Sequence, residues 1–184
     1  MNMNWRTEMQ ENKVISICFV CLGNICRSPT AEAVMLQRIH QNNLQDRIYI
    51  DSAGTAAYHV GEQADARSRE HALNRGYHIR SRARQFTKED LDKFDYVIVM
   101  DRSNQQNILR LCTTEEQKQK IYLFRSFEGE ENNLMKQYDV PDPYYGGSKG
   151  FEMVLDICER CSDGLIDFIY KNTKSNHINP TKNL

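Results

Sequence analysis

The sequence has almost no net charge and no long hydrophobic run. Its formal charge is −1 over 184 residues, so the chain has no bulk electrostatic attraction for nucleic acid or for an anionic membrane. No apolar stretch approaches the ~20 residues of a membrane-spanning helix. Residues 1–13 have neither the apolar core nor the small-residue cleavage site of a signal peptide. We therefore expect a cytoplasmic protein with no membrane span and no nucleic-acid partner.

The sequence also lacks a disulfide framework and a metal-ligand pattern. A chain of this length buries enough surface to fold without covalent cross-links. Cys158 and Cys161 share one helical pattern with no second ligand pair nearby, and the five histidines are scattered. We expect no metal and no cofactor, and we interpret these two cysteines, with Cys18 and Cys112, as small buried hydrophobic residues.

Short apolar segments alternate with helical patterns along the chain. Apolar runs of strand length cover 14–20, 48–54, 94–101 and 121–124. Unbroken apolar strands separated by helices are typical of a parallel sheet that is covered on both faces. The pattern predicts an α/β fold, a single doubly wound domain with a four-stranded parallel sheet and helices on both faces.

Helical periodicity fills the intervals between these strands. Gly76 follows one such pattern and is the residue type that commonly ends a helix. The polar, unpatterned ends predict a disordered N-terminal extension at 1–12 and a disordered tail at 172–184, around a folded domain at 13–171. The expected helices cover 30–41, 65–75, 101–111 and about 148–171.

The stretch CLGNICRSP, residues 21–29, directly follows the first expected strand. Ligands of doubly wound folds bind where the carboxyl end of a strand leads into a helix. Gly23 and Asn24 tolerate the positive φ that a tight loop requires, so that successive N–H groups can surround a tetrahedral anion. Ser28 can cap the following helix, and Arg27 can grip two oxygens of the anion. The stretch predicts a phosphate-binding loop.

Cys21 lies at the base of this loop. Helix N-termini and neighbouring cations lower a cysteine pKa from about 8.5 to roughly 3.5–7.5. A thiolate beneath a phosphate ester can attack phosphorus, and water can then hydrolyse the cysteinyl-phosphate. The spacing of Cys21 and Arg27 alone is a weak signal. The signal becomes specific when it is combined with the strand before the loop, the Gly-Asn pair inside the loop and the Ser-Pro pair that ends it.

The segment YDVPDPYYGG offers the general acid that expulsion of an alkoxide or phenolate requires. Asp142 lies between two prolines, which stiffen the loop. Tyr144 and Tyr145 follow and can form the wall of a pocket for an aromatic ring. Asp139 is the alternative acid, and an ordinary polar turn is the alternative to any functional role.

Together these residues resemble the low-molecular-weight protein tyrosine phosphatase family. The resemblance spans about 14–170 and depends on the blocks FVCLGNICRSP, IDSAGT, FDYVIVMDRSN and DPYYG. It implies phosphotyrosine hydrolysis with Cys21 as nucleophile, Arg27 as transition-state clamp and Asp142 as proton donor and later base. It also implies phosphotyrosine proteins as substrates, with a cognate tyrosine kinase as one candidate, and a loop that phosphate or sulfate can occupy.

The resemblance implies supporting residues as well. Asn24, Ser28 and Ser52 would hold the loop and stabilise the thiolate. Ser81 stands where many members carry a histidine, so the fourth contact of this network is left open. Asp101 would support the loop, and it can equally be the N-cap of the following helix. The loop positions implied to bind phosphate and substrate also include Leu22, Gly23, Ile25 and Cys26.

Three of the positions bear on substrate preference and redox chemistry. Ile25 is large and apolar, as in tyrosine-directed members, whereas the arginine-phosphate-directed relatives carry threonine there. Tyr58 matches a wall position that is often tryptophan in animal members, so the chain looks more bacterial than animal. Cys26 could trap oxidised Cys21 as a disulfide, or it could simply pack the floor of the loop.

Two rival functions belong to other classes. An arsenate reductase of the same fold uses a similar loop but needs a downstream redox relay, and Cys112, Cys158 and Cys161 lack a convincing loop context. A non-catalytic phosphate-binding module would be expected to lack the nucleophile, the clamp or the acid, and all three are present.

Overall fold

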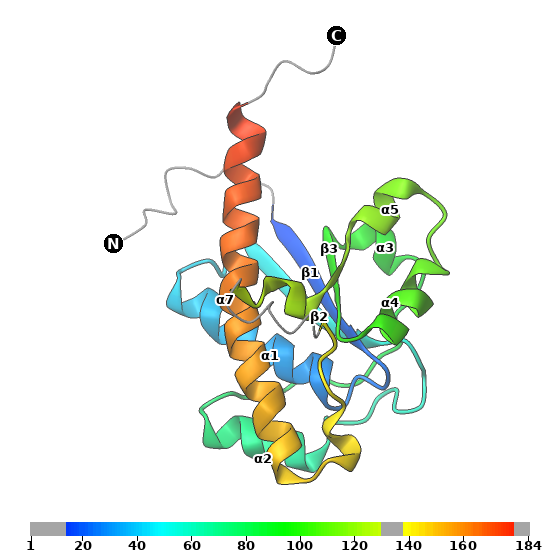
Figure 1. Cartoon of the computed structure of the whole chain (residues 1–184), viewed down its shortest axis with the longest axis vertical. Coiled ribbons are helices and arrows are strands. Elements are labelled where there is room, and N and C mark those ends of the chain that lie inside the picture. The colour runs from blue at the N-terminus through cyan, green and yellow to red at the C-terminus, as the bar shows by residue number, and fades with distance from the viewer. Residues whose placement is uncertain (1–13, 130–137, 179–184) are drawn as a thin grey trace.

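The computed structural model describes residues 14–129 and 138–178. Its sheet has four parallel strands in the order β2-β1-β3-β4 (Figure 1). This arrangement confirms the predicted α/β fold and four-stranded parallel sheet. The strands are β1 (Ile15–Cys21), β2 (Ile48–Gly54), β3 (Tyr96–Val99) and β4 (Ile121–Leu123).

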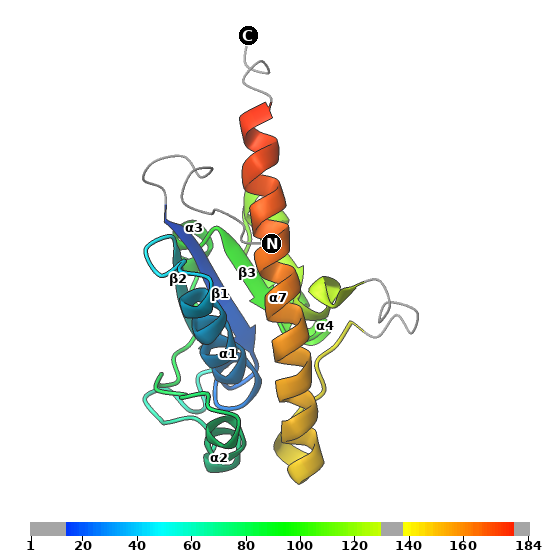
Figure 2. The same cartoon turned by 90° about the vertical axis from the view of Figure 1, so that its left-hand side faces the viewer.

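The strands are buried on both faces, as their unbroken apolar sequences predict. On β1, Ile17 and Phe19 point into one core cluster, whereas Cys18 and Val20 point into the other. The first cluster packs beneath α1 (Arg27–Gln41) and α7 (Ser148–Ile178), which lie side by side in Figures 1 and 2. The second cluster lies on the side of α3 (Asp90–Lys93) and α4 (Arg102–Leu109).

The other helices of the described residues are α2 (Ala66–Asn74), α5 (Glu115–Gln119), and the short 3-10 helices η1 (Phe124–Phe127) and η3 (Pro143–Tyr145).

Three helix ends have caps of the residue types that favour them. Asp65 is the N-cap of α2 and accepts a hydrogen bond from the N–H of Arg67. Gly76, just past the C-cap of α2, has a φ of 83°, the left-handed conformation that glycine adopts without a steric penalty. Asp101 is likewise the N-cap of α4. Its predicted capping role is therefore confirmed.

The start of α1 differs from the prediction. The helix begins at Arg27 rather than Thr30, so Ser28 lies inside its first turn and is not the N-cap. Cys26 occupies the cap position, and no side chain caps the helix there. The Ser28 hydroxyl faces Cys21 instead, because the tight loop brings the sulfur over the first turn.

The end of α7 also differs from the prediction. The helix continues past Lys171 to Ile178, because polar residues continue a helix already anchored by its apolar face. The expected extension at 1–12 and the last part of the expected tail, 179–184, lie outside the described residues. Within the described ranges, no helix is both long and apolar enough to cross a membrane.

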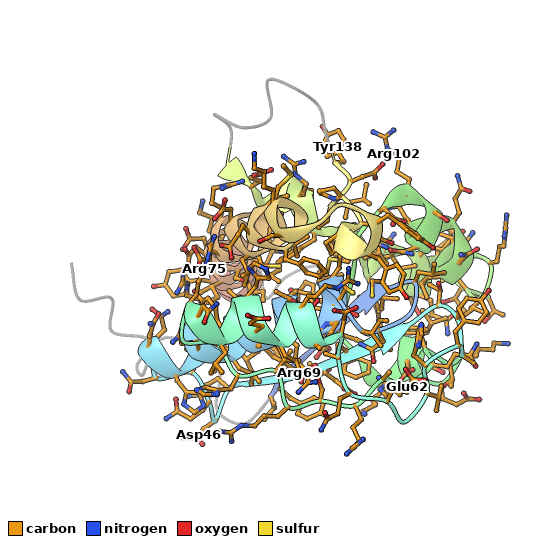
Figure 3. All side chains as sticks on the ribbon, turned by 90° about the horizontal axis from the view of Figure 1, so that it is seen from below. Asp46, Glu62, Arg69, Arg75, Arg102 and Tyr138 are labelled. Atoms are coloured by element: carbon orange, nitrogen blue, oxygen red, sulfur yellow. The ribbon has the colours of Figure 1, made fainter. Side chains whose placement is uncertain are left out.

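Ion pairs join α2 to α7. Arg75, the C-cap residue of α2, pairs with Glu152, Asp156 and Glu159 of α7. Figure 3 views the molecule from below and labels Arg75 beside these helices. The contacts fasten α2 to the base of α7, on the side of the molecule that carries the loop between β1 and α1.

Candidate active site

The loop between β1 and α1 has the conformation of a tight anion-binding turn. Asn24 has a φ of 55°, which is the left-handed conformation that asparagine tolerates. Gly23, in contrast, does not have a positive φ. Its lack of a side chain matters because a Cβ would lie 3.0 Å from the Cδ2 atom of His59. The predicted positive φ is confirmed for Asn24. It is wrong for Gly23, where glycine is needed for the space beside His59 instead.

The sulfur of Cys21 is held at the base of the loop. It is 3.0 Å from the Ser28 hydroxyl and 3.3 Å from the main-chain N–H of Asn24, which donates to it. The Asn24 side chain donates from Nδ2 to Ser28 Oγ and to Ser52 Oγ, each at 2.9 Å. These contacts bring together the three residues expected to support the loop.

Arg27 connects the loop to two distant segments. Its side chain is 5% exposed, and Nη1 donates to Asp101 Oδ2 at 2.6 Å. Nη2 donates to Asp142 Oδ2 at 3.3 Å, and Nη1 also donates to the carbonyl of Val140. Burial opposes its charge, but Cys21 and the two aspartates outweigh burial and raise the pKa of the guanidinium. Arg27 therefore remains charged in the site.

The two candidate acids lie in different surroundings. Asp142 precedes η3, where its Oδ1 accepts from the N–H of Tyr144, and it lines the same pocket as Cys21. Asp139 accepts from the N–H of Arg102 and does not line that pocket. Of the two carboxylates, Asp142 is therefore the one that shares a pocket with Cys21.

The pocket above Cys21 is open and partly aromatic. Tyr58 and Tyr145 stand at its mouth, 75% and 90% exposed, and the rings of Tyr144 and Tyr145 meet edge to face at 5.0 Å. Among the described residues, no group of three or more His, Cys, Asp and Glu side chains is placed to hold a metal ion. The lining residues are Cys21, Leu22, Gly23, Ile25, Cys26, Arg27, Tyr58, His59, Asp142, Tyr144 and Tyr145.

Sequence reasoning missed two residues of this pocket region. His59 lies over Gly23, and its Nδ1 is 2.9 Å from Glu62 Oε2. Arg67 lies 5.2 Å from the centre of the Tyr144 ring and donates to the Tyr144 carbonyl. His59 could have been predicted from its position next to Tyr58, a predicted wall residue. Nothing in the local sequence indicated Arg67.

Cys26 is a buried residue of the loop. Burial raises the pKa of its thiol to about 12. Such a thiol stays protonated at neutral pH and is a poor nucleophile. Disulfide formation with Cys21 stays a prediction.

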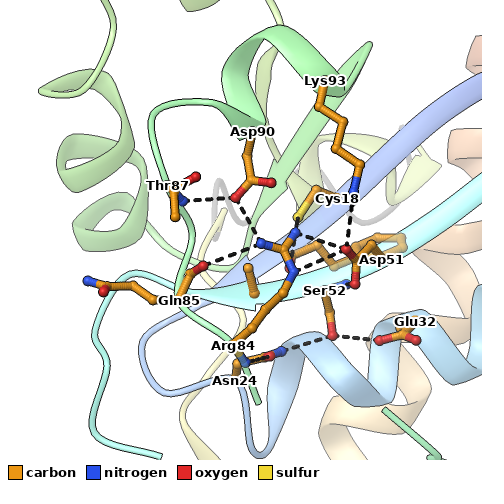
Figure 4. Close-up of polar contacts among 12 residues, drawn as sticks. Cys18, Asn24, Glu32, Asp51, Ser52, Arg84, Gln85, Thr87, Asp90 and Lys93 are labelled. Carbon is orange, nitrogen blue, oxygen red and sulfur yellow. Dashed lines mark hydrogen bonds and ion pairs between the residues drawn. The ribbon is translucent and has the colours of Figure 1, made fainter. Parts of the chain in front are cut away.

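The network beneath the loop extends further than the sequence indicated. Ser52 Oγ donates to Glu32 Oε2 at 2.5 Å. The Ser81 hydroxyl acts to lower the pKa of the Glu32 carboxyl, so Ser81, at the contact that the sequence left open, lies beside this network. Figure 4 shows the line of contacts from Asn24 through Ser52 to Glu32.

A thiol at the base of a tight loop, at the carboxyl edge of a parallel sheet, defines a class of α/β proteins that bind tetrahedral anions beside a cysteine. Residues 16–175 match the family described as low molecular weight phosphotyrosine protein phosphatase. The chain belongs to this family, and the resemblance seen in the sequence is confirmed.

Relatives in distant organisms support the assignment. The chain is 41% identical over 150 residues to a low molecular weight protein-tyrosine-phosphatase of Streptomyces coelicolor, covering 82% of this chain and 90% of the relative. It is 40% identical to a low molecular weight phosphotyrosine protein phosphatase of Rattus norvegicus, covering 83% and 94%. A crystal structure of a protein tyrosine phosphatase from Entamoeba histolytica superposes with a TM-score of 0.80 at 44% identity, covering 86% and 98%.

Proposed function

We propose that this chain hydrolyses phosphotyrosine monoesters in proteins through a cysteinyl-phosphate intermediate. The observation that carries the proposal is that Cys21, Arg27 and Asp142 line one pocket. This pocket therefore combines a nucleophile, an oxyanion clamp and a proton donor, the three groups that the reaction needs. A cognate tyrosine kinase is one candidate among the substrates.

The first half-reaction transfers the phosphoryl group to sulfur. Loop N–H groups and the Arg27 guanidinium bind the phosphate oxygens, and the Cys21 thiolate attacks phosphorus from below. As the S–P bond forms, the bond from phosphorus to the tyrosine oxygen breaks. Protonated Asp142 gives its proton to that oxygen, so tyrosine leaves as a neutral phenol.

The second half-reaction restores the enzyme. Asp142, now a carboxylate, takes a proton from water as the water oxygen attacks phosphorus. The S–P bond breaks, and its electron pair returns to Cys21 as thiolate. Inorganic phosphate then leaves, and Asp142 is again protonated for the next cycle.

The aromatic walls support an aryl phosphate as substrate. Tyr58, Tyr144 and Tyr145 line the pocket together with the apolar Ile25, and aromatic rings pack favourably against an aryl group. Arsenate reduction has less support, since Cys158 and Cys161 lie on the buried face of α7, within the core. The cysteines that line the pocket are Cys21 and Cys26.

Rapid-quench kinetics test the proposal. Phosphotyrosine, phosphoserine and phosphoarginine peptides would be mixed with wild-type protein and with Cys21→Ser, Asp142→Asn and Asp139→Asn variants. We expect phosphate on Cys21 with the phosphotyrosine peptide, no turnover by Cys21→Ser, and a loss of about 10²–10⁴ in kcat for Asp142→Asn. Asp139→Asn serves as the matched control and should remain near wild type.

Two results would contradict the proposal. Absence of covalent phosphate with all three peptides would favour arsenate reduction or simple anion binding. Loss of the acid limb of the pH profile in Asp139→Asn, rather than in Asp142→Asn, would move the proton donor to Asp139.

A further inference from the structure

Glu32 is a half-buried carboxylate on α1 that takes no part in the proposed chemistry. Burial raises the pKa of its carboxyl group, and hydrogen bonds from Ser52 and Ser81 act in the opposite direction. The charged groups that act on Glu32 are Asp51, which raises this pKa, and Arg84, which lowers it. Burying a carboxylate anion costs free energy unless hydrogen bonds compensate for the lost hydration.

The amide of Asn24 fixes the direction of the hydrogen bonds between Glu32 and Cys21. Asn24 Oδ1 accepts from the main-chain N–H of Arg84 at 3.0 Å. Its Nδ2 therefore faces Ser28 Oγ and Ser52 Oγ, each 2.9 Å away (Figure 4 shows the Ser52 contact). Because an amide nitrogen donates two protons and accepts none, both serine oxygens are acceptors here. Each serine must use its own proton elsewhere.

Each serine oxygen lies within hydrogen-bond distance of the group at one end of the network. Ser28 Oγ is 3.0 Å from Cys21 Sγ, with the Ala53 carbonyl at 3.3 Å as the other acceptor. Ser52 donates to Glu32 Oε2. A thiolate and a carboxylate both accept hydrogen bonds only, so an anion at each end is compatible with the same orientation of every donor between them.

We propose that Glu32 is a positioning residue for the nucleophile Cys21. The Glu32 carboxylate keeps the Ser52 hydroxyl turned away from Asn24, and this arrangement keeps Ser28 donating to the Cys21 sulfur. This inference rests on the proposed function in requiring Cys21 to react as a thiolate. Without an acceptor at position 32, the Ser52 proton competes with the Asn24 Nδ2 donor, and the contact between Asn24 and Ser52 that holds the loop in place is weakened.

The sign of the effect separates positioning from simple charge repulsion. Glu32 and the Cys21 thiolate carry the same charge, so a purely coulombic influence of Glu32 would disfavour the thiolate. Removing Glu32 would then promote ionisation of Cys21. Positioning through Ser52 predicts the opposite, because the thiolate loses an aligned donor.

The test is the pH dependence of Cys21 alkylation by iodoacetamide, followed on the Cys21 peptide by mass spectrometry. We expect Glu32→Met to move the midpoint upward by about one pH unit, a roughly tenfold slower reaction at lower pH, because only the thiolate reacts. Glu32→Gln retains an oxygen that accepts from Ser52, and we expect it to recover at least half of the shift. Glu70→Met, at an exposed glutamate of α2, is the matched control and should match wild type.

Ser52→Ala tests the same link without adding bulk, and it serves if Glu32→Met does not fold. We expect it to raise the midpoint, and we expect Glu32→Gln to add nothing in the Ser52→Ala background. An unchanged or lowered midpoint in either Glu32→Met or Ser52→Ala overturns the proposal. Alkylation requires no phosphoryl transfer, so wild-type protein that is alkylated at Cys21 but hydrolyses no phosphotyrosine would overturn the proposed function alone.

Discussion

Asp101 uses its two carboxylate oxygens for two different tasks. Oδ1 accepts from the N–H of Asn104 at 2.7 Å and caps α4, while Oδ2 holds Arg27 at 2.6 Å. The cap needs only an acceptor, whereas the contact with Arg27 gains strength from the negative charge. One residue therefore couples the start of a helix to the position of the arginine in the pocket.

Substitutions at Asp101 should separate these tasks. Asp101→Asn keeps an oxygen for the cap but leaves the buried Arg27 less compensated, and we expect a loss of about 2 kcal/mol in unfolding free energy. Asp101→Ala also loses the cap, which costs about 1 kcal/mol more. Urea unfolding measures both, with exposed Asp46→Asn as a control. Equal losses in the two variants would show that the cap contributes nothing.

At the scale of elements, α7 and η1 approach each other closely at a glycine. A Cβ on Gly164 would overlap the main-chain oxygen of Phe127. Phe127 in turn packs against Phe168 of α7, with ring centres 5.2 Å apart. Because the atom that blocks a side chain belongs to the backbone, it cannot turn aside as a flexible side chain would. The absence of a side chain at Gly164 therefore allows α7 to pack closely against η1.

Gly164→Ala should lower the unfolding free energy by about 2 kcal/mol or more through overpacking, despite the roughly 1 kcal/mol that alanine contributes to helix propensity. Ser162→Ala on the same helix is the control, since Ser162 Oγ is buried with no hydrogen-bond partner among the described residues. We expect that variant to be at least as stable as wild type. A stabilised Gly164→Ala protein in chemical denaturation would refute the packing argument.

At the scale of the whole molecule, charged side chains join segments that are far apart in the sequence. Glu152 of α7 pairs with His71 and Arg75 at the end of α2, and Asp163 of α7 pairs with Arg38 of α1. The hydrogen bond from His71, followed by that from Arg75, lowers the pKa of the Glu152 carboxyl. Its ionised form therefore stabilises the fold.

This stabilisation should depend on pH in a defined direction. Since the pKa of Glu152 is lower in the folded chain, the contribution is complete above the unfolded value of about 4.3. It disappears as pH falls through the folded pKa. We expect Glu152→Gln to lose at most about 1 kcal/mol at pH 7, because the group is partly exposed, and to equal wild type near pH 3.

Thermal or urea unfolding across that range measures the difference. Glu70→Gln, on the exposed side of α2, should show no such pH-dependent gap. A constant gap between Glu152→Gln and wild type at all pH values would indicate lost packing rather than lost charge.

Much of the fold was predictable because its signals are local. Apolar runs predicted β2 over 48–54 as the structure has it, and Gly76 marked the end of α2. Alternation of strands and helices then led to a parallel sheet. The extent of α7 was not predictable, since polar residues past Lys171 carry no periodic signal and the helix is anchored from its apolar face.

The sequence by itself determined the family, the sheet and the loop from Cys21 to Arg27, because each is encoded in short spacings along the chain. The resemblance implied that Asp101, Asp142 and Ser52 serve that loop, but only the tertiary structure shows which atoms meet there. Asp101 and Asp142 meet Arg27 across 74 and 115 positions, and Glu32 reaches Asn24 only through Ser52 of a neighbouring strand. Such contacts follow from the order of the strands and the packing of helices, and no local spacing records them.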